Sequence, residues 1–253
     1  MRARWLAVAV LMWSSAQAQP IELSGSIGGR QVVADLNRNG DTVSGWLYSL
    51  KNGTQLRLEG QLVPQGLFDI TAFNAASNTR AGRFTGRIKN GHWTGNWRDN
   101  GAKAKKPVAL DNLSNVSPPD GRYRCTTRRH DESFGFSLRH SLDLTLSGGK
   151  VKGLTLTRQT KSDGENAQSC RLTAGDLKQA PGKGTIILRA KADPARCTLR
   201  ILSAGDYLLI RPGRTDQAGD DCRAAASSQF CSANAFWSDL VINKKSQSCK
   251  SVE

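Results

Sequence analysis

The stretch Phe84-Thr-Gly-Arg-Ile-Lys-Asn-Gly-His-Trp-Thr-Gly-Asn-Trp97 decides the fold of the first half of this chain. It contains one five-residue phrase twice: an apolar residue, any residue, glycine, any residue and a second apolar residue. The same phrase occurs earlier at 23–27, 43–47 and 58–62. Because side chains alternate between the two faces of a strand, each phrase puts its apolar residues and its glycine on one face. Glycines at the same place in several strands predict a sheet that curls tightly over its apolar side, as a small barrel does.

Turn signals between the apolar runs complete the prediction of an antiparallel meander. Asn39-Gly40, Asn52-Gly53 and Asn90-Gly91 are dipeptides typical of hairpin turns. Eight strands are expected, at 21–28, 30–37, 42–49, 54–62, 67–74, 82–89, 91–98 and 107–111. One polar and one apolar face per strand favours an antiparallel sheet that closes into a small barrel, with Trp93 and Trp97 in its core.

Residues 1–18 have the features of an export signal. Arg2 and Arg4 precede a short apolar run, and Ala16-Gln17-Ala18 is a small-x-small cleavage site. The run is shorter than the roughly 20 apolar residues that span a bilayer. We therefore expect an exported protein, periplasmic or secreted, without a transmembrane segment once the signal is removed.

A polar segment at 112–120, which contains Pro118-Pro119, divides the rest of the chain into a barrel-like domain (19–111) and a cysteine-rich domain (121–253). The second domain holds all six cysteines: Cys125, Cys170, Cys197, Cys222, Cys231 and Cys249. An even number of cysteines in an exported chain predicts disulfides, and Cys170 with Cys197 is the preferred first pair. No cysteine or histidine spacing suits a metal, so neither a metal nor a cofactor is expected.

The cysteine-rich domain is also predicted to be mainly β, which makes the whole chain all-β. Its strands are expected at 123–127, 141–146, 150–157, 185–190, 197–202, 207–210 and 236–242. One or two short helices are expected, with candidates at Leu172–Gln179, where Thr173 would be the N-cap, and at Arg223–Gln229.

The chain is strongly basic, with a formal net charge of +15. Residues 19–111 hold 12 basic and 7 acidic side chains, and residues 119–253 hold 22 and 14, so both halves share the excess. Such a surface attracts anionic partners at low salt. For an exported protein these are an anionic envelope polymer, lipid head groups or an acidic protein, and nucleic acid is not expected.

Two aromatic residues are predicted on the outer face of the barrel. If Val43 and Leu47 face inward, Trp46 and Tyr48 face outward. With Arg57 and Arg87 on other strands they would form a platform for a sugar ring or a protein. The alternative is that the second domain covers them, because large exposed apolar patches are uncommon on monomers.

Basic clusters on either side of the linker suggest an anion site at the domain junction. Lys105 and Lys106 precede the linker, and Arg122, Arg124, Arg128 and Arg129 follow it. An ordinary solvated charged surface is the alternative.

Histidines offer the one route to catalysis that the sequence suggests. His130 is followed by Asp131 and Glu132, and His140 by Asp143. General acid–base catalysis needs such groups within hydrogen-bond reach of each other. No nucleophile or metal-hydrolase motif accompanies them. An envelope hydrolase is therefore an alternative to a non-catalytic protein.

The barrel motifs Gly45-Trp-Leu-Tyr48 and Trp93-Thr-Gly-Asn-Trp97 resemble small β-barrel modules of uncharacterised exported bacterial proteins. The segment Phe230-Cys-Ser-Ala-Asn-Ala-Phe236, with Cys249, resembles the end of disulfide-bonded periplasmic proteins associated with lysozyme inhibition. The first resemblance implies a barrel and transfers no functional residue. The second implies a periplasmic inhibitor or immunity protein against a cell-wall hydrolase. The sequence as a whole favours an exported, non-catalytic binding protein.

Overall fold

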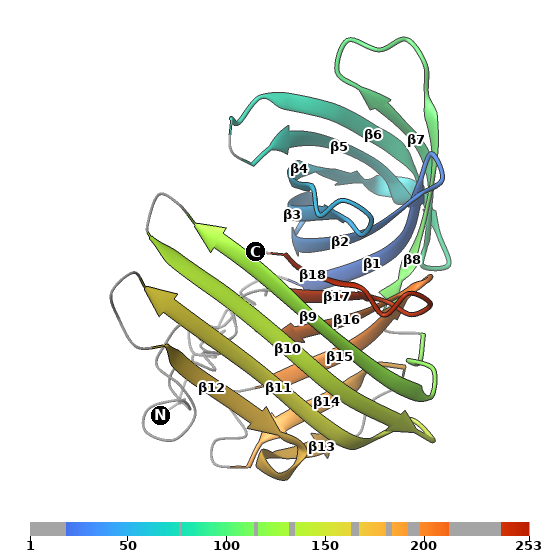
Figure 1. Cartoon of the computed structure of the whole chain (residues 1–253). Coiled ribbons are helices and arrows are strands. Elements are labelled where there is room, and N and C mark those ends of the chain that lie inside the picture. Colours follow the sequence, from blue (N-terminus) through green and yellow to red (C-terminus); the bar gives the residue numbers. More distant parts are fainter. Residues whose placement is uncertain are drawn as a thin grey trace, which may run out of the picture.

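The structure is a computed structural model in which two β-units stack against each other (Figure 1). It describes residues 19–75, 77–113, 116–131, 135–162, 167–180, 184–191, 198–212 and 239–252. The predicted export signal and the predicted helix at Arg223–Gln229 lie outside these residues. In the described part of the chain, no helix has the length and apolar character needed to cross a membrane.

The first unit is a closed barrel of eight antiparallel strands, as predicted. Each strand pairs with the next, and the last pairs with the first, so the sheet has no free edge. The strands are β1 (Gln19–Ile27), β2 (Arg30–Asn39), β3 (Thr42–Ser49), β4 (Gln55–Val63), β5 (Leu67–Asn74), β6 (Arg80–Lys89), β7 (His92–Asp99) and β8 (Lys106–Asn112), with a single 3-10 turn, η1 (Pro64–Gly66), between β4 and β5.

The repeated glycines lie where neighbouring strands of the barrel approach each other closely. A Cβ atom added to Gly95 would overlap the carbonyl oxygen of Thr85 on β6, and one added to Gly60 would overlap that of Asp69 on β5. A similar overlap with a neighbouring strand occurs at the other three phrases, at Gly25, Gly45 and Gly86. Only glycine fits this wall, which explains why the phrase is repeated.

Aromatic rings fill the barrel. The ring of Phe68 lies 5.1 Å from that of Phe84 and 5.1 Å from that of Trp93, between ring centroids. Phe84 and Trp97 follow at 6.3 Å. All four side chains are buried, which confirms that Trp93 and Trp97 belong to the core.

The described part of the second unit has ten strands in two antiparallel sheets. The four-stranded sheet has the order β12-β11-β10-β9, and the six-stranded sheet runs from β13 to β18 in chain order. The strands are β9 (Gly121–Asp131), β10 (Phe136–Ser147), β11 (Lys150–Ser162), β12 (Gln168–Thr173), β13 (Leu177–Ala180), β14 (Ile186–Ala190), β15 (Thr198–Ala204), β16 (Tyr207–Pro212), β17 (Asp239–Asn243) and β18 (Cys249–Val252).

The helix predicted at Leu172–Gln179 is wrong. β12 runs to Thr173, a single 3-10 turn η3 (Ala174–Asp176) follows, and β13 begins at Leu177. Thr173 does cap the turn, because its N–H and its Oγ1 donate to Asp176 Oδ2 at 2.8 and 2.7 Å. Thr173 therefore caps a 3-10 turn at the corner between the two sheets, and not a helix.

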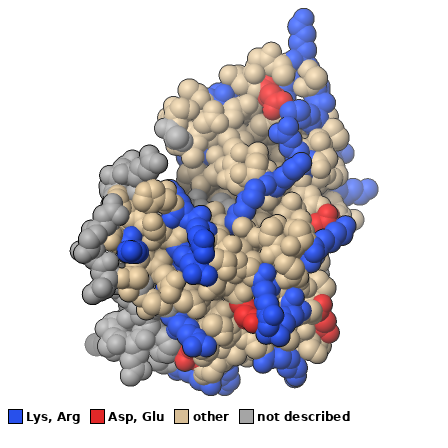
Figure 2. All heavy atoms as spheres, in the orientation of Figure 1, with Lys and Arg blue, Asp and Glu red and all other residues tan. Residues whose placement is uncertain are grey.

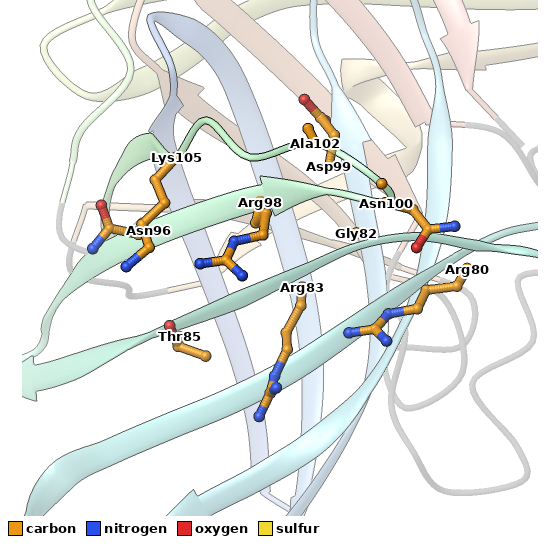
Figure 3. Close-up of a pocket in the computed structure, with 11 residues that line it drawn as sticks. Arg80, Gly82, Arg83, Thr85, Asn96, Arg98, Asp99, Asn100, Ala102 and Lys105 are labelled. Carbon is orange, nitrogen blue, oxygen red and sulfur yellow. The ribbon is translucent and has the colours of Figure 1, made fainter.

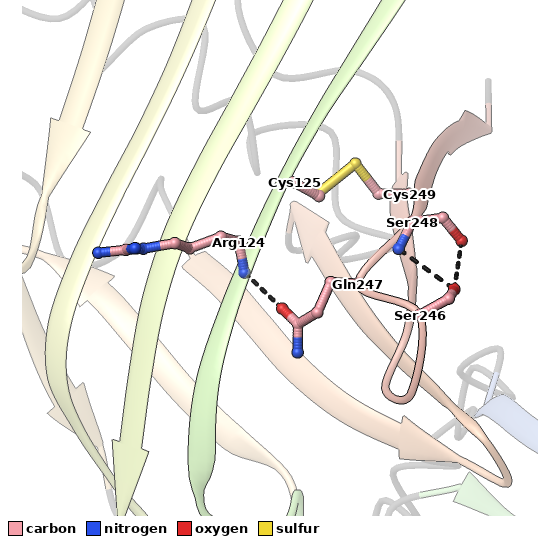
Figure 4. Close-up of a disulfide and its surroundings, with 6 residues drawn as sticks. All are labelled: Arg124, Cys125, Ser246, Gln247, Ser248 and Cys249. Atoms are coloured by element: carbon pink, nitrogen blue, oxygen red, sulfur yellow. Dashed lines mark hydrogen bonds between the residues drawn. A yellow bond between two sulfur atoms is a disulfide. The ribbon is translucent and has the colours of Figure 1, made fainter.

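The two sheets of the second unit enclose a common core of leucine and isoleucine side chains, such as Leu144 and Leu156 from one sheet and Ile201 and Leu208 from the other. At one side of this core β9 and β18 are joined by the disulfide Cys125–Cys249 (Figure 4). The backbone N–H of Arg124 also donates to Gln247 Oε1 at 2.8 Å. The two sheets are therefore closed against each other along this side.

The Cys125–Cys249 disulfide was not singled out from the sequence. Its cysteines are 124 residues apart, and their Cα atoms lie 5.7 Å apart. The preferred pair, Cys170 with Cys197, falls outside the residues whose side chains are described, as do Cys222 and Cys231.

The outer face of the six-stranded sheet packs on the outer wall of the barrel. Val33, Tyr48 and Leu50 of the barrel meet Leu202 and Leu209 of the sheet in one buried apolar cluster. Strands β15 to β17 are therefore buried on both faces. This explains the uninterrupted apolar run Leu208-Leu209-Ile210, whose members point alternately into the two cores.

Ion pairs flank this apolar contact between the units. Arg211 Nη1 of β16 lies 2.6 Å from Asp35 Oδ1 of β2 and 3.4 Å from Glu22 Oε1 of β1. Arg200 Nη1 of β15 lies 2.6 Å from Glu22 Oε2. The guanidinium of Arg211 also lies over the ring of Tyr48, 5.6 Å from its centroid.

Candidate functional site: a basic face on the four-stranded sheet

The outer face of the four-stranded sheet is polar and carries a cluster of cations. Alternate residues of these strands, such as Leu142, Leu144 and Leu156, point into the core, so the residues between them point outward. We call the outward set the basic sheet face. Its cations are Arg122, Arg124 and Arg128 of β9, Arg139 of β10, Lys161 of β11 and Arg171 of β12.

Hydroxyl groups lie between these cations. Thr126, Ser141 and Thr157 are cross-strand neighbours in one row, which Arg171 continues on β12. Figure 2 views the molecule with this sheet at the front and shows more basic than acidic side chains over it. The face therefore offers charged donors and hydroxyl groups on a regular grid.

The electrostatics differ along the face. At one end Asp143 accepts hydrogen bonds from Arg122 at 3.0 and 2.8 Å and from Arg124 at 3.0 Å. The bond from Arg122 is the main cause that lowers the pKa of Asp143 below its ordinary value, and it raises the pKa of Arg122 in return. Positive charge is therefore partly neutralised at this end.

At the other end the positive charge is not neutralised. Arg128 and Arg139 stand directly opposite each other on β9 and β10. Cβ atoms of such a pair are about 5 Å apart, and like charges there destabilise a sheet. Within the described ranges, neither these two arginines nor Lys161 and Arg171 have a hydrogen bond or an ion pair. An anion placed over Arg128 and Arg139 would relieve their repulsion.

The predicted aromatic platform is corrected by the structure. Trp46 and Tyr48 do point away from the barrel core, as predicted, but the six-stranded sheet covers them. Tyr48 is only 3 % exposed, and Trp46 packs at the edge of the same apolar cluster. They join the two units of the protein, so Tyr48 cannot contact an external ligand.

The other predicted binding residues do not form one cluster at the domain junction. Arg57 bonds to Glu59 and lies over the Phe73 ring, 5.0 Å from its centroid. Lys106 is paired with Asp99. Arg87 is exposed on β6, and Lys105 lies in the loop that follows β7. Arg129 points to the face of β9 opposite that of Arg128, because it is the next residue in the strand.

Three members of the basic sheet face were missed from the sequence. The strands predicted at 141–146 and 150–157 were too short to include Arg139 and Lys161. β12, which carries Arg171, was not predicted, and its last two residues were assigned to the helix at Leu172–Gln179. The alternation Arg139, Ser141, Asp143 along β10 was the available signal, since all three fall on one face.

The histidines do not share a cleft. His130 lies on the outer face, with Nδ1 3.0 Å from Ser137 Oγ, whereas His140 is buried on the inner face at 3 % exposure. Asp143 is on the outer face and bonded to arginines, so it is not on the side of His140. Where side chains are described, no group of three or more His, Cys, Asp or Glu could hold a metal ion.

Comparisons with known protein families, with characterised proteins and with solved structures find no match to this chain.

Proposed function

We propose that this protein is an exported, non-catalytic binding protein that holds an anionic polymer of the bacterial envelope on the basic sheet face. The observation that carries the proposal is the pair Arg128 and Arg139, which stand opposite each other without a carboxylate partner in the described structure. A sheet that tolerates this repulsion in the free state gains stability when an anion binds.

A polymer suits this face because its cations are spread over it. Residues two apart in a strand project about 6.8 Å apart, and neighbouring strands lie about 4.8 Å apart. Arg122 and Arg128 of β9 are therefore separated by about 20 Å. Repeating charges along a chain can contact several of these positions at once, which adds affinity without a deep pocket.

The disulfide supports the proposed compartment. Cys125–Cys249 joins strands far apart in the sequence, and disulfides persist in oxidising compartments such as the periplasm and the exterior. It also keeps the sheet rigid, which lowers the entropy lost when a polymer binds.

The test is binding of the purified protein to envelope fractions and to polyglutamate, across a range of salt concentrations. We expect binding that weakens as salt rises. The double variant Arg128→Glu with Arg139→Glu should lose about tenfold or more in affinity.

A matched control is the double variant Arg87→Glu with Lys89→Glu, on exposed positions of β6. It changes the net charge equally but leaves the basic sheet face intact. If both double variants lose affinity equally, binding follows net charge alone and the proposed face is wrong. Absence of any envelope or polyglutamate binding would dispose of the proposal as a whole.

The same face favours a second candidate, an inhibitor or immunity protein that docks on an acidic cell-wall hydrolase. Glycoside hydrolases act through paired carboxylates, and unpartnered arginines complement such a cleft. Co-purification of a hydrolase, and protection of cells from lysis that is lost with Arg128→Glu, would favour this candidate over the polymer.

A further inference from the structure

The outer wall of the barrel has a groove that the proposed function does not use. It is an open hollow of about 440 Å³, formed by β6, β7 and the loop from β7 to β8 (Figure 3). Thr85 and Asn96 line it together with four basic side chains. The basic residues are Arg80, Arg83, Arg98 and Lys105. Its size is within the range of small-molecule sites.

Hydrogen bonds fix the loop that forms one side of the groove. Asp99, at the end of β7, accepts a hydrogen bond from Trp97 Nε1 at 2.7 Å and is paired with Lys106 at the start of β8. The bond from Lys106 is the main cause that lowers the pKa of Asp99. The Asn100 N–H donates to the Ala81 carbonyl oxygen at 2.9 Å. Lys105 is thus held above β6 and β7 by a closed loop.

The acidic groups near the groove are already paired. Asp99 is neutralised by Lys106, and Asp69 of β5 holds Arg83 through two hydrogen bonds, one of 2.6 Å from Nε. The bond from Arg83 is the main cause that lowers the pKa of Asp69. Arg83 is therefore held in one orientation.

The remaining cations of the groove are available to a ligand. Arg83 and Arg98 face each other across β6 and β7. Arg80, Arg98 and Lys105 have neither a hydrogen bond nor an ion pair among the residues that the structure describes. Figure 3 shows the side chains of Arg80, Arg83 and Arg98 projecting from adjacent parts of the same wall. Two unpaired guanidinium groups, those of Arg80 and Arg98, and the ammonium group of Lys105 therefore surround one hollow, with the paired Arg83 between them.

We propose that this groove binds a phosphate group. A guanidinium presents a planar fork of N–H donors that matches phosphate oxygens in pairs. A carboxylate has two oxygens and one charge, too few for two unpaired guanidinium groups and an ammonium group. A phosphomonoester has three terminal oxygens and between one and two negative charges at neutral pH, which fits the donors and the charge of the groove. A soluble phosphomonoester and a lipid whose headgroup is a phosphomonoester present the same chemistry, so the site fits both.

Calorimetry with the purified protein tests the proposal, with inorganic phosphate as the first probe and acetate for comparison. We expect phosphate to bind and acetate to bind at least about tenfold more weakly. Arg98→Gln should weaken phosphate binding by about tenfold, as expected for one lost charge-assisted contact. The matched control is Arg87→Gln, two residues beyond Thr85 on the same outer face of β6 but outside the groove, and it should leave phosphate binding unchanged.

Two further arms distinguish the sources of the phosphate. Glycerol 1-phosphate represents a soluble ligand, and phosphatidylcholine vesicles with and without phosphatidic acid represent a lipid headgroup. Stronger binding to either, lost in Arg98→Gln, supports the site and names its source. The proposal is overturned if phosphate fails to bind at about 10 mM, if acetate binds equally well, or if Arg98→Gln and Arg87→Gln behave alike. Because Arg128 and Arg139 lie outside the groove, their double variant should retain phosphate binding, so this test is independent of the polymer proposal.

Discussion

At the scale of single residues, arginine side chains have two different roles in this protein. The partners of each arginine show which role it has. Arg211 and Arg200 face carboxylates across the contact between the units and hold the structure together. Arg128 and Arg139 face each other, and in the described structure neither forms an ion pair with a carboxylate. The ion pairs of Arg211 and Arg200 stabilise the fold, whereas the repulsion between Arg128 and Arg139 does not. We therefore assign binding to the basic sheet face.

Asp143 limits the charge of that face, so its removal should strengthen binding. In Asp143→Asn the net charge of the face rises by one, and Arg122 and Arg124 lose the carboxylate charge and one of the two acceptor oxygens that now hold them. We expect affinity for polyglutamate to rise about threefold at low salt, with the gain disappearing at high salt. A weaker or unchanged affinity at low salt would mean that these two arginines do not contact the polymer.

The glycines of the barrel wall should not tolerate even one added methyl group. In Gly95→Ala the new Cβ would overlap the Thr85 carbonyl oxygen on the neighbouring strand, and we expect a loss of about 3 kcal/mol in the free energy of unfolding. Urea denaturation measures the loss. Gly153→Ala is the control, because its Cβ would lie 3.8 Å from the Thr145 side chain, an ordinary contact, and its stability should change by less than about 0.5 kcal/mol. Equal losses at the two glycines would contradict the close approach of β6 and β7.

At the scale of elements, the barrel could be predicted strand by strand because its signals are local. Each phrase shows which face is inside, and turn dipeptides such as Asn90-Gly91 mark the ends of the strands. The second unit could not be predicted as fully. The corner at η3 contains the Thr173 capping signal that helices also use, and a strand as short as β18 has no periodicity to recognise.

Whether the second domain covers Trp46 and Tyr48 could not be decided from the sequence, for a related reason. The outward position of Tyr48 follows from alternation within one strand, but its cover comes from β15 to β17, more than 140 residues later. Nothing local to 43–49 reports that contact. The apolar run Leu208-Leu209-Ile210 indicates a strand that is buried on both faces. It does not indicate which part of the chain packs on each face.

The disulfide between β9 and β18 should be a major source of stability for the second unit. It closes a loop of 124 residues, for which chain entropy predicts a contribution of about 5 kcal/mol. We expect the double variant Cys125→Ser with Cys249→Ser to lose about 2–5 kcal/mol in the free energy of unfolding, measured by urea denaturation. A change below about 1 kcal/mol would show that the packing between the two sheets suffices without the bond.

At the scale of the whole molecule, the two units are joined by an apolar contact with charges at its margin. Val33, Leu202 and Leu209 are almost fully buried in it, so the barrel and the six-stranded sheet each complete the other's surface. As far as the described residues go, this arrangement leaves the four-stranded sheet and the β6–β7 wall of the barrel uncovered. Both proposed binding surfaces therefore lie on faces that the contact between the units does not use.

Arg211 is the most buried of the charged side chains that pair across that contact. It is 2 % exposed and approaches both Asp35 and Glu22, so Arg211→Ala would leave two largely buried carboxylates with less compensation. Removing one partner of such a buried group costs about 3–5 kcal/mol, and we expect a loss at the lower end because the carboxylates retain some contact with water.

The measurement is urea denaturation of Arg211→Ala, Asp35→Asn and the double variant. The double variant should lose less than the sum of the two single variants, because the uncompensated Asp35 charge is then absent. Arg57→Ala, which breaks the exposed pair with Glu59, is the control and should cost about 1 kcal/mol or less. If Arg211→Ala costs no more than Arg57→Ala, or if the two losses at Arg211 and Asp35 simply add, the ion pair does not hold the units together and the apolar cluster alone does.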